Sequence, residues 1–308
     1  MLKLDHSYLC SYLIAILAAL PIFLTTKIVV ANTLITECGS SIENVTPSTL
    51  ASKVGGSGCK TLVLTPGTYP RLSISNRTSG ILTLRCSSPG QCIVGNGSVV
   101  SNVNGLIIDG IQIRGGAEGL RVKGGSKNVL VQRSKFIEQT SAGLTLGIGT
   151  QNDNIQVYDN EFRNAKLGCQ YNSSNCTGYL SDGSPVAEMD YGLRVYDTKS
   201  VDIKGNLFGT MFNHAISLKY SVVSASITNN TFDGCGRTCI ELGQDSPACG
   251  EAVGTGNVFK GKRLHDVYFR NLNRAVITDN TFIAAKTAFK TGTGPAGRVI
   301  IKEPNTFQ

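Results

Sequence analysis

The feature that most constrains this chain is the motif Asn-x-Phe, which recurs through much of its length. It occurs at residues 160–162, 206–208, 230–232, 257–259, 280–282 and 305–307, with Ser134-Lys135-Phe136 as a variant. Successive phenylalanines lie 26, 46, 24, 27, 23 and 25 residues apart. A period in the twenties, with apolar and polar residues alternating inside each unit, is typical of stacked β coils rather than of helical repeats.

Each repeat places two short strand patterns before the motif. In one unit, alternating apolar and polar residues run from His214 to Ser221 and again from Ser224 to Phe232. The apolar side chains of such strands point inward and stack on the same positions of neighbouring coils, about 4.8 Å apart. We expect the Asn and Phe of the turn to stack as internal ladders that satisfy backbone groups and fill the core.

The repeat resembles the right-handed parallel β-helix of the pectate lyase-like superfamily. The resemblance covers nearly all of the chain after its N-terminal leader and implies an all-β fold. The fold expected is a single-stranded right-handed parallel β-helix, a solenoid with coils of 23–27 residues. Leucine-rich repeats would need Leu-x-x-Leu-x-Leu units, which the sequence does not contain. Because a shared fold does not settle activity, function has to be sought in the outward-facing residues.

The first 31 residues have the pattern of a secretory signal peptide. Lys3 precedes a long apolar run, and Val29-Val30-Ala31 supplies small residues for cleavage. A membrane anchor is the alternative, since the run nearly reaches spanning length, but Pro21 and Lys27 interrupt it. We therefore expect a secreted, periplasmic or extracellular protein, with one domain over residues 32–308 and no stable membrane anchoring after cleavage.

Two segments depart from the repeat. Residues 47–54 are expected to form a short N-terminal capping helix, with Thr46 as the cap and Pro47 at the first helical position. Between Phe162 and the next first strand lies an inserted loop, residues 163–190, where other coils have six residues. Long loops inside a regular scaffold are usually functional or disordered. A tolerated surface excursion is the alternative.

Nine cysteines remain after Cys10 leaves with the leader, and export favours disulfides. Proximity along the chain predicts three bridges: Cys38 with Cys59, Cys86 with Cys92, and Cys169 with Cys176. The last three cysteines, Cys235, Cys239 and Cys249, then share one bridge and one free thiol, and their pairing stays open. A zinc site is disfavoured because no Cys-x-x-Cys pair exists.

The charge balance indicates an anionic partner. The chain has a formal net charge of +8, and a basic exported protein is suited to an acidic polysaccharide, because charge steers such encounters. Nucleic acid is disfavoured by export and by the lack of a Lys/Arg cluster. We expect the protein to act as a monomer.

Aligning the first strands of the coils gives three outward columns. The column before the strand holds Ala142, Tyr191, His214, Thr238 and His265; the column within it holds Arg121, Thr145, Arg194, Ser217, Glu241 and Tyr268; the column at its end holds Lys123, Gly147, Tyr196, Lys219, Gly243 and Arg270. A solvated sheet face also carries charge. The concentration of His, Tyr and Arg, rather than Thr, Asn and Ser, favours a functional site over that alternative.

This residue set suits cleavage of a polyuronide by β-elimination. The reaction removes the proton beside the uronate carboxylate, which requires a base, a cation that neutralises the carboxylate, and an acid for the leaving oxygen. Neighbouring positive charge and partial burial lower the pKa of a lysine enough for it to act as a base. Lys219, flanked by Arg194 and Arg270, fits that description.

The other polar residues of the face are expected to fill the remaining roles. The arginines at 194 and 270 are expected to neutralise the carboxylate, and Tyr196, His214 or His265 to supply the acid. Arg121, Tyr191, Glu241 and Tyr268, with Arg194, are expected to bind substrate. Oxygen ligands for a calcium ion are available from Glu188, Asp190 and Glu241, although such carboxylates often only hydrogen-bond backbone.

A narrower resemblance supports the lysine. Ile216-Ser217-Leu218-Lys219, followed by a coil ending in Asn-Thr-Phe, is similar to the strand that carries the catalytic lysine in β-helical alginate and chondroitin-B lyases. That resemblance implies Lys219 as the base, with calcium helping to neutralise the uronate. The next coil departs from the family pattern, because Gly243 stands where the family places an arginine.

Three alternatives stay open. A uronate C5-epimerase uses the same proton abstraction, although the Asp-Pro-His-Glu motif of mannuronan epimerases is absent. Hydrolysis would need clustered carboxylates, and no Asp-Asp pair appears near the patch. The rival of a different class is a non-catalytic, carbohydrate-binding or adhesin-like β-helix. The sequence thus favours a polysaccharide lyase without settling that the protein is an enzyme.

Overall fold

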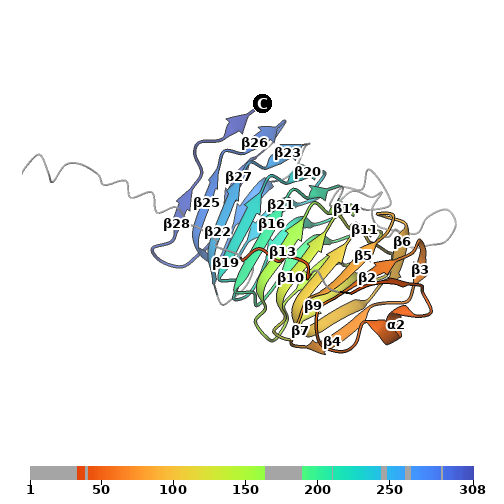
Figure 1. Cartoon of the computed structure of the whole chain (residues 1–308). Helices are drawn as coiled ribbons and strands as arrows, with labels where there is room; N and C mark the ends of the chain where they lie inside the picture. The colour runs from red at the N-terminus through yellow and green to blue at the C-terminus, as the bar shows by residue number, and fades with distance from the viewer. Residues whose placement is uncertain are drawn as a thin grey trace, which may run out of the picture.

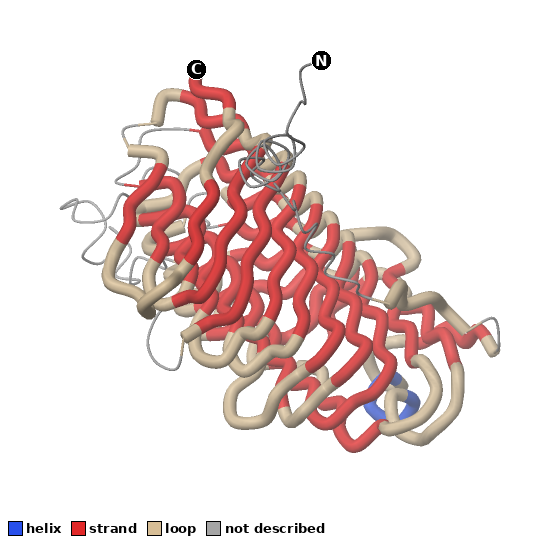
Figure 2. Tube along the Cα trace, turned by 90° about the vertical axis from the view of Figure 1, so that its left-hand side faces the viewer, coloured by secondary structure: helices blue, strands red, loops and turns tan. Residues whose placement is uncertain are grey.

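The computed structural model describes residues 33–38, 41–163, 189–209, 211–243, 248–260, 265–285 and 287–308. Within them the chain winds into a parallel β-solenoid, in which strands of successive coils lie side by side (Figures 1 and 2). Each strand pairs in parallel with the strand at the same place in the next coil. The predicted all-β solenoid is confirmed.

The strands form three faces. The first face contains β4 (Ser73–Arg77), the start of β7 (Ser98–Asp109), β9 (Glu118–Lys123), β12 (Ala142–Leu146), β15 (Tyr191–Val195), β18 (His214–Leu218), β21 (Thr238–Leu242), β24 (His265–Phe269) and β27 (Phe289–Thr291). The second face contains β1 (Ile42–Val45), β2 (Lys60–Leu64), β5 (Leu82–Cys86), the end of β7, β10 (Lys127–Gln132), β13 (Asp153–Tyr158), β16 (Ser200–Lys204), β19 (Ser224–Thr228), β22 (Cys249–Thr255), β25 (Leu272–Thr278) and β28 (Val299–Ile301). The third face contains β3 (Gly67–Tyr69), β6 (Cys92–Gly95), β8 (Gln112–Arg114), β11 (Lys135–Ile137), β14 (Glu161–Arg163), β17 (Leu207–Phe208), β20 (Thr231–Asp233), β23 (Val258–Lys260), β26 (Thr281–Ile283) and β29 (Thr306–Phe307).

The Asn-x-Phe motif builds two internal ladders along the third face, as predicted. The phenylalanine rings from Phe136 to Phe307 stack with successive centroids 4.7–5.3 Å apart. From Asn160 to Asn305, each side-chain amide donates to the Oδ1 of the Asn in the next coil at 2.9–3.1 Å. The ladders align every coil in one register, because a slipped coil would lose both contacts.

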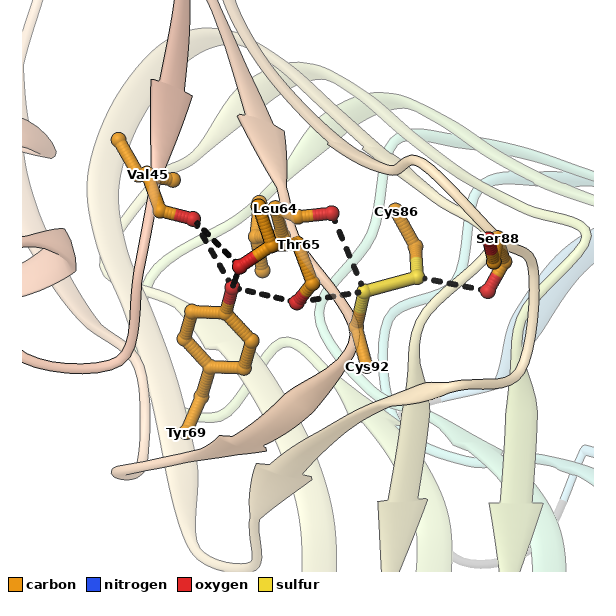
Figure 3. The surroundings of a disulfide bond; sticks show 7 residues. All are labelled: Val45, Leu64, Thr65, Tyr69, Cys86, Ser88 and Cys92. Carbon is orange, nitrogen blue, oxygen red and sulfur yellow. Dashed lines mark hydrogen bonds between the residues drawn. A yellow bond between two sulfur atoms is a disulfide. The ribbon is translucent and has the colours of Figure 1, made fainter.

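The regular coils begin earlier than the motif indicates. Phe136 is in register with Ile113, then Val94, then Tyr69 on the third face. In the first of these coils the Tyr69 hydroxyl lies 3.0 Å from the carbonyl oxygen of Val45 and 2.7 Å from that of Thr65 (Figure 3). Ile and Val fill the same inward position as Phe. The Asn-x-Phe motif therefore does not mark these earlier coils, although their side chains pack in the same core.

The N-terminal cap is shorter than predicted. Helix α2 covers only Leu50–Lys53, because Thr46 to Thr49 form a turn in which the Thr46 carbonyl accepts from the amides of Thr49 and Leu50, each at 3.1 Å. Leu50 and Val54 are buried, and α2 lies at the N-terminal end of the solenoid (Figure 1). The predicted helix over 47–54 is therefore wrong in length, although the segment covers the core.

The predicted bridges Cys38–Cys59 and Cys86–Cys92 are both present, the second drawn in Figure 3. Cys235 pairs with Cys239, which leaves Cys249 as a buried free thiol. The predicted Cys169–Cys176 bridge, the signal peptide and nearly all of the inserted loop lie outside the described residues. Among the described residues, no helix has the length and apolar character needed to cross a membrane.

Candidate functional site

The register of the first face brings the predicted columns together. The strand pairings align Ala142, Tyr191, His214, Thr238 and His265 in one column, and Arg121, Thr145, Arg194, Ser217, Glu241 and Tyr268 in the next. At the strand ends, the amide of Lys219 donates to the Val195 carbonyl at 2.7 Å, and that of Arg270 to the Leu242 carbonyl at 2.8 Å. The side chains predicted from separate repeats thus share one surface.

Lys219, directly after β18, is at the centre of this surface. Its side chain is held against two tyrosines, with Nζ 5.0 Å from the ring centroid of Tyr191 and 5.7 Å from that of Tyr196. Tyr196 in turn stacks on Tyr220, with ring centroids 5.6 Å apart. Lys219 is only 8% exposed. Contacts of this kind hold the lysine side chain through cation–π attraction.

A buried carboxylate, Glu241, organises the next coils. It is 1% exposed, accepts from Ser217 Oγ at 3.1 Å and from Arg270 Nη1 at 3.0 Å, and lies 3.5 Å from His214 Nε2. A buried carboxylate needs such partners to offset its lost hydration. We therefore assign Glu241 a positioning role, in which it orients the guanidinium of Arg270.

His214 is neutral at neutral pH. Burial lowers its pKa to about 4, although the neighbouring Glu241 opposes the shift. Its Nδ1 is buried and has no hydrogen-bond partner among the described residues. As a neutral imidazole facing a carboxylate, it is poorly suited to the acid role predicted for it.

A second carboxylate, Glu118 of β9, pairs with both Arg121 and Arg194. Arg194 also lies over the ring of Tyr191, with Cζ 5.2 Å from its centroid. Arg194 is therefore near Lys219, whereas Arg121 belongs to the Glu118 cluster and is not brought to the lysine. Glu118 is aligned with Ala142, so extending the first predicted column by one coil would have found it.

His265 and Tyr268 lie toward the C-terminal end of the face, with ring centroids 6.2 Å apart. Burial, with the charges of Lys290 and Arg237, lowers the pKa of His265. Lys290, which sequence reasoning missed, is in register with Tyr268. This group lies two and three coils beyond Lys219 and forms a separate cluster.

Gly243 is glycine for a structural reason. Its φ is +81°, and a Cβ there would overlap the backbone carbonyl of Asn271. The arginine that the lyase resemblance places here therefore does not fit this backbone. The backbone of Asn271 fills the space that this side chain would need, and Arg270 comes from the following coil.

Of the three calcium ligands predicted from the sequence, Glu188 lies outside the described residues, so the calcium site stays a prediction. The main-chain carbonyl oxygen of Asp190 accepts from the backbone amide of His214 at 2.9 Å. Glu241 is already engaged by Arg270 and Ser217. Within the described part of the chain, no group of three or more His, Cys, Asp or Glu side chains is arranged to hold a metal ion.

Comparison with solved structures supports the fold. A PL6 family alginate lyase, AlyGC, superposes with a TM-score of 0.51 at 15% identity, covering 90% of this chain and 41% of the lyase. A variant of that lyase gives a TM-score of 0.54 at 16% identity over the same shares. Pectate lyase Pel9A gives 0.45 at 14% identity, covering 86% of this chain and 80% of its own. At such identities the likeness concerns the fold alone, and the chain spans less than half of AlyGC.

No curated protein matches the sequence. A family model does match, from residue 90 to residue 295. This range includes the coils from β6 to β27 and all of the clusters around Lys219, Glu118 and Glu241. The chain therefore belongs to the family described as periplasmic copper-binding protein (NosD).

Proposed function

We propose that this protein is an exported polysaccharide lyase that cleaves an acidic, uronate-containing glycan by β-elimination. The observation that carries the proposal is the placement of Lys219. Its amine lies against Tyr191 and Tyr196, on a face where Arg194 and Arg270 are the neighbouring cations. The periplasmic description of the family and the disulfides fit export.

In the proposed reaction Lys219, as a neutral amine, removes the proton from the sugar carbon beside the carboxylate. The electron pair of that C–H bond forms a carbon–carbon double bond, and the adjacent glycosidic C–O bond breaks. Tyr196 donates its phenolic proton to the leaving oxygen, and proton exchange with solvent restores both groups. A tyrosine is preferred over His214 because the buried imidazole is neutral.

We place the substrate carboxylate on the first face, between Lys219 and Arg270. Lys219 and Arg270 are two coils apart, about 10 Å, and no side chain stands between them in their column. Arg270 is held by Glu241, and its side chain is 35% exposed. A positioned guanidinium stabilises the charge that develops on the carboxylate as the proton leaves.

The proposed reaction assigns no step to a metal ion, and Ca²⁺ is varied only as a condition of the experiment below. Calcium, expected from the lyase resemblance, would supply further charge neutralisation, with Glu188, Asp190 and Glu241 as the candidate ligands. For the copper named in the family description, no group of three or more His, Cys, Asp or Glu side chains is assembled among the described residues. We therefore route no step through either metal.

The second candidate function is a non-catalytic, glycan-binding β-helix, and one observation favours it. Both arginines that would neutralise the uronate are already in ion pairs, Arg194 with Glu118 and Arg270 with Glu241. Such pairs also suit a rigid binding surface. A uronate C5-epimerase would use the same Lys219 chemistry but return a proton to the other face of the sugar.

The deciding experiment follows the ultraviolet absorbance of the unsaturated uronate that elimination leaves. The secreted protein is incubated with alginate, pectate, and chondroitin or dermatan sulfate, with and without Ca²⁺. We expect a rise on one polymer, lost in Lys219→Ala and kept in Lys204→Ala, which removes an exposed lysine of the second face. No rise on any polymer would overturn the lyase proposal and leave binding or epimerisation.

A further inference from the structure

The C-terminal end of the first face repeats an arrangement found around Lys219. There, two cations lie over the ring of Tyr191, Arg194 at 5.2 Å and Lys219 at 5.0 Å from its centroid. Three coils further on, two cations lie over the ring of Tyr268, Arg270 at 5.7 Å and Lys290 at 4.9 Å. Each ring thus has two cations against it.

A cavity adjoins this second group. It has a volume of about 410 Å³ and is lined by Arg270, Asn271, Thr293, Gly294 and Pro295. Arg298 fixes the segment that contributes Thr293, Gly294 and Pro295 to this lining. The guanidinium of Arg298 donates to the carbonyl oxygen of Arg270 at 3.0 Å and to that of Gly292 at 2.6 Å.

The cluster is positively charged. Within the described part of the chain, Lys290 and Arg298 form no ion pair, and Arg270 has one ion-pair partner, Glu241. Lys290 is exposed, so its ammonium is available to a ligand. The cations, the ring and the cavity therefore lie together at one end of the surface proposed to bind a glycan.

We propose that Tyr268 and Lys290, beside Arg270, form a second subsite, which binds a carboxylate- or sulfate-bearing sugar of the same chain. The ring of Tyr268 packs on the sugar face, and the Lys290 ammonium binds its anionic group through charge-assisted hydrogen bonds. The inference rests on the proposed function only in that the first face binds an acidic glycan; it does not require Lys219 to be a base.

The position of the subsite makes it specific for long ligands. Lys219 and Lys290 are three coils apart, about 14 Å. A disaccharide at Lys219 cannot reach Lys290, whereas an oligosaccharide of several sugars lying along the first face contacts both. The subsite therefore contributes affinity that depends on chain length.

The test measures binding, by isothermal titration calorimetry, in a Lys219→Ala background that prevents turnover. The probes are uronate oligosaccharides and dermatan sulfate oligosaccharides, each as disaccharide and hexasaccharide. We expect Lys290→Ala to weaken hexasaccharide binding about tenfold without changing disaccharide binding, and Lys290→Arg to restore it. Lys204→Ala serves as the matched control of lost surface charge. The oligosaccharide series that shows the effect identifies carboxylate or sulfate as the anion.

Equal hexasaccharide affinity with and without Lys290, at an unchanged melting temperature, would overturn the subsite. Tyr268→Ala gives an independent check, because it removes the ring and keeps both cations. If the Lys219→Ala protein with Lys290 intact binds none of the probes, the subsite and the proposed function both fail. If it binds hexasaccharides through Lys290 but yields no unsaturated product, only the lyase proposal fails.

Discussion

At the scale of single residues, His214 makes stability depend on pH. Burial lowers its pKa in the folded protein to about 4, against 6.5 for an unperturbed imidazole. Between those values the unfolded chain binds a proton that the folded chain does not, so stability falls as the pH falls through this window. Glu241 opposes the shift, while Arg237 and Lys219 add to it. From pH 7 to pH 4.5 the loss attributable to His214 is roughly 2–3 kcal/mol.

The measurement is urea unfolding of the wild type and of His214→Gln at both pH values. Glutamine does not titrate, so the variant should lose less stability on acidification by about that amount. Carboxylates elsewhere titrate in both proteins and cancel in the difference. An identical loss in the two proteins would show that His214 is protonated equally in the folded and unfolded chains.

The two tyrosines beside Lys219 are expected to differ in role. Burial, with the nearby Asp190 and Glu241, raises the pKa of Tyr191 to about 12, so its hydroxyl stays protonated and suits a binding contact. Under the proposed mechanism, Tyr196→Phe lowers kcat about 100-fold or more, as loss of a general acid does. Tyr191→Phe mainly raises KM. Steady-state kinetics of both variants tests this, and the reverse pattern would make Tyr191 the acid.

At the scale of the element, the sequence predicted the strand register and the outward columns, because the repeat determines both. The columns on the first face follow from strand register, which the Asn and Phe ladders specify once per coil. The pairing of Glu118 with two arginines was not predicted, since ion pairs depend on side-chain conformation rather than on register. The coils around Ile113 and Val94 lie inside the predicted β-helix domain but lack the Asn-x-Phe motif, because an inward position needs apolar volume and not a particular residue.

The asparagine ladder gives a stability prediction. In Asn230, the side-chain amide donates to the Ile203 carbonyl at 2.9 Å and to Asn257 Oδ1 at 3.0 Å, while its Oδ1 accepts from the Asn206 amide at 2.9 Å. Asn230→Ala leaves these buried groups unpaired and should cost at least about 2 kcal/mol. Asn273→Ala, at an exposed position of β25, should change stability by less than about 0.5 kcal/mol.

Denaturant unfolding of the two variants checks this expectation. Circular dichroism of each should first establish that the solenoid has formed. Equal stability of Asn230→Ala and Asn273→Ala would mean that ordered water or a shifted backbone replaces the lost bonds, and that the ladder contributes register rather than stability.

At the scale of the whole molecule, the N-terminal segment 33–38 joins coils that are not neighbours. It crosses the outer side of the second face (Figure 1), where the Thr33 carbonyl accepts from Asn154 and Gln156 of β13 at 3.0 and 2.7 Å. Its other end is tied to Cys59 by the Cys38 disulfide. The sequence gives one indication of this segment: Ile107 and Leu130 are apolar at outward positions, and both are buried against it.

In a solenoid each coil contacts only its neighbours, so stability is close to a sum of nearest-neighbour terms. Segment 33–38 adds a link from the first coil to β13, and Ile35, 7% exposed, is its apolar anchor against Ile107 and Leu130. Ile35→Ala should therefore cost about 2 kcal/mol or more and broaden the unfolding transition, because distant coils are no longer coupled. Leu34→Ala, at a residue 71% exposed, is the adjacent control and should do neither. If both variants unfold alike under non-reducing conditions, the Cys38–Cys59 bridge alone holds the segment, and the apolar contact contributes nothing measurable to coupling between coils.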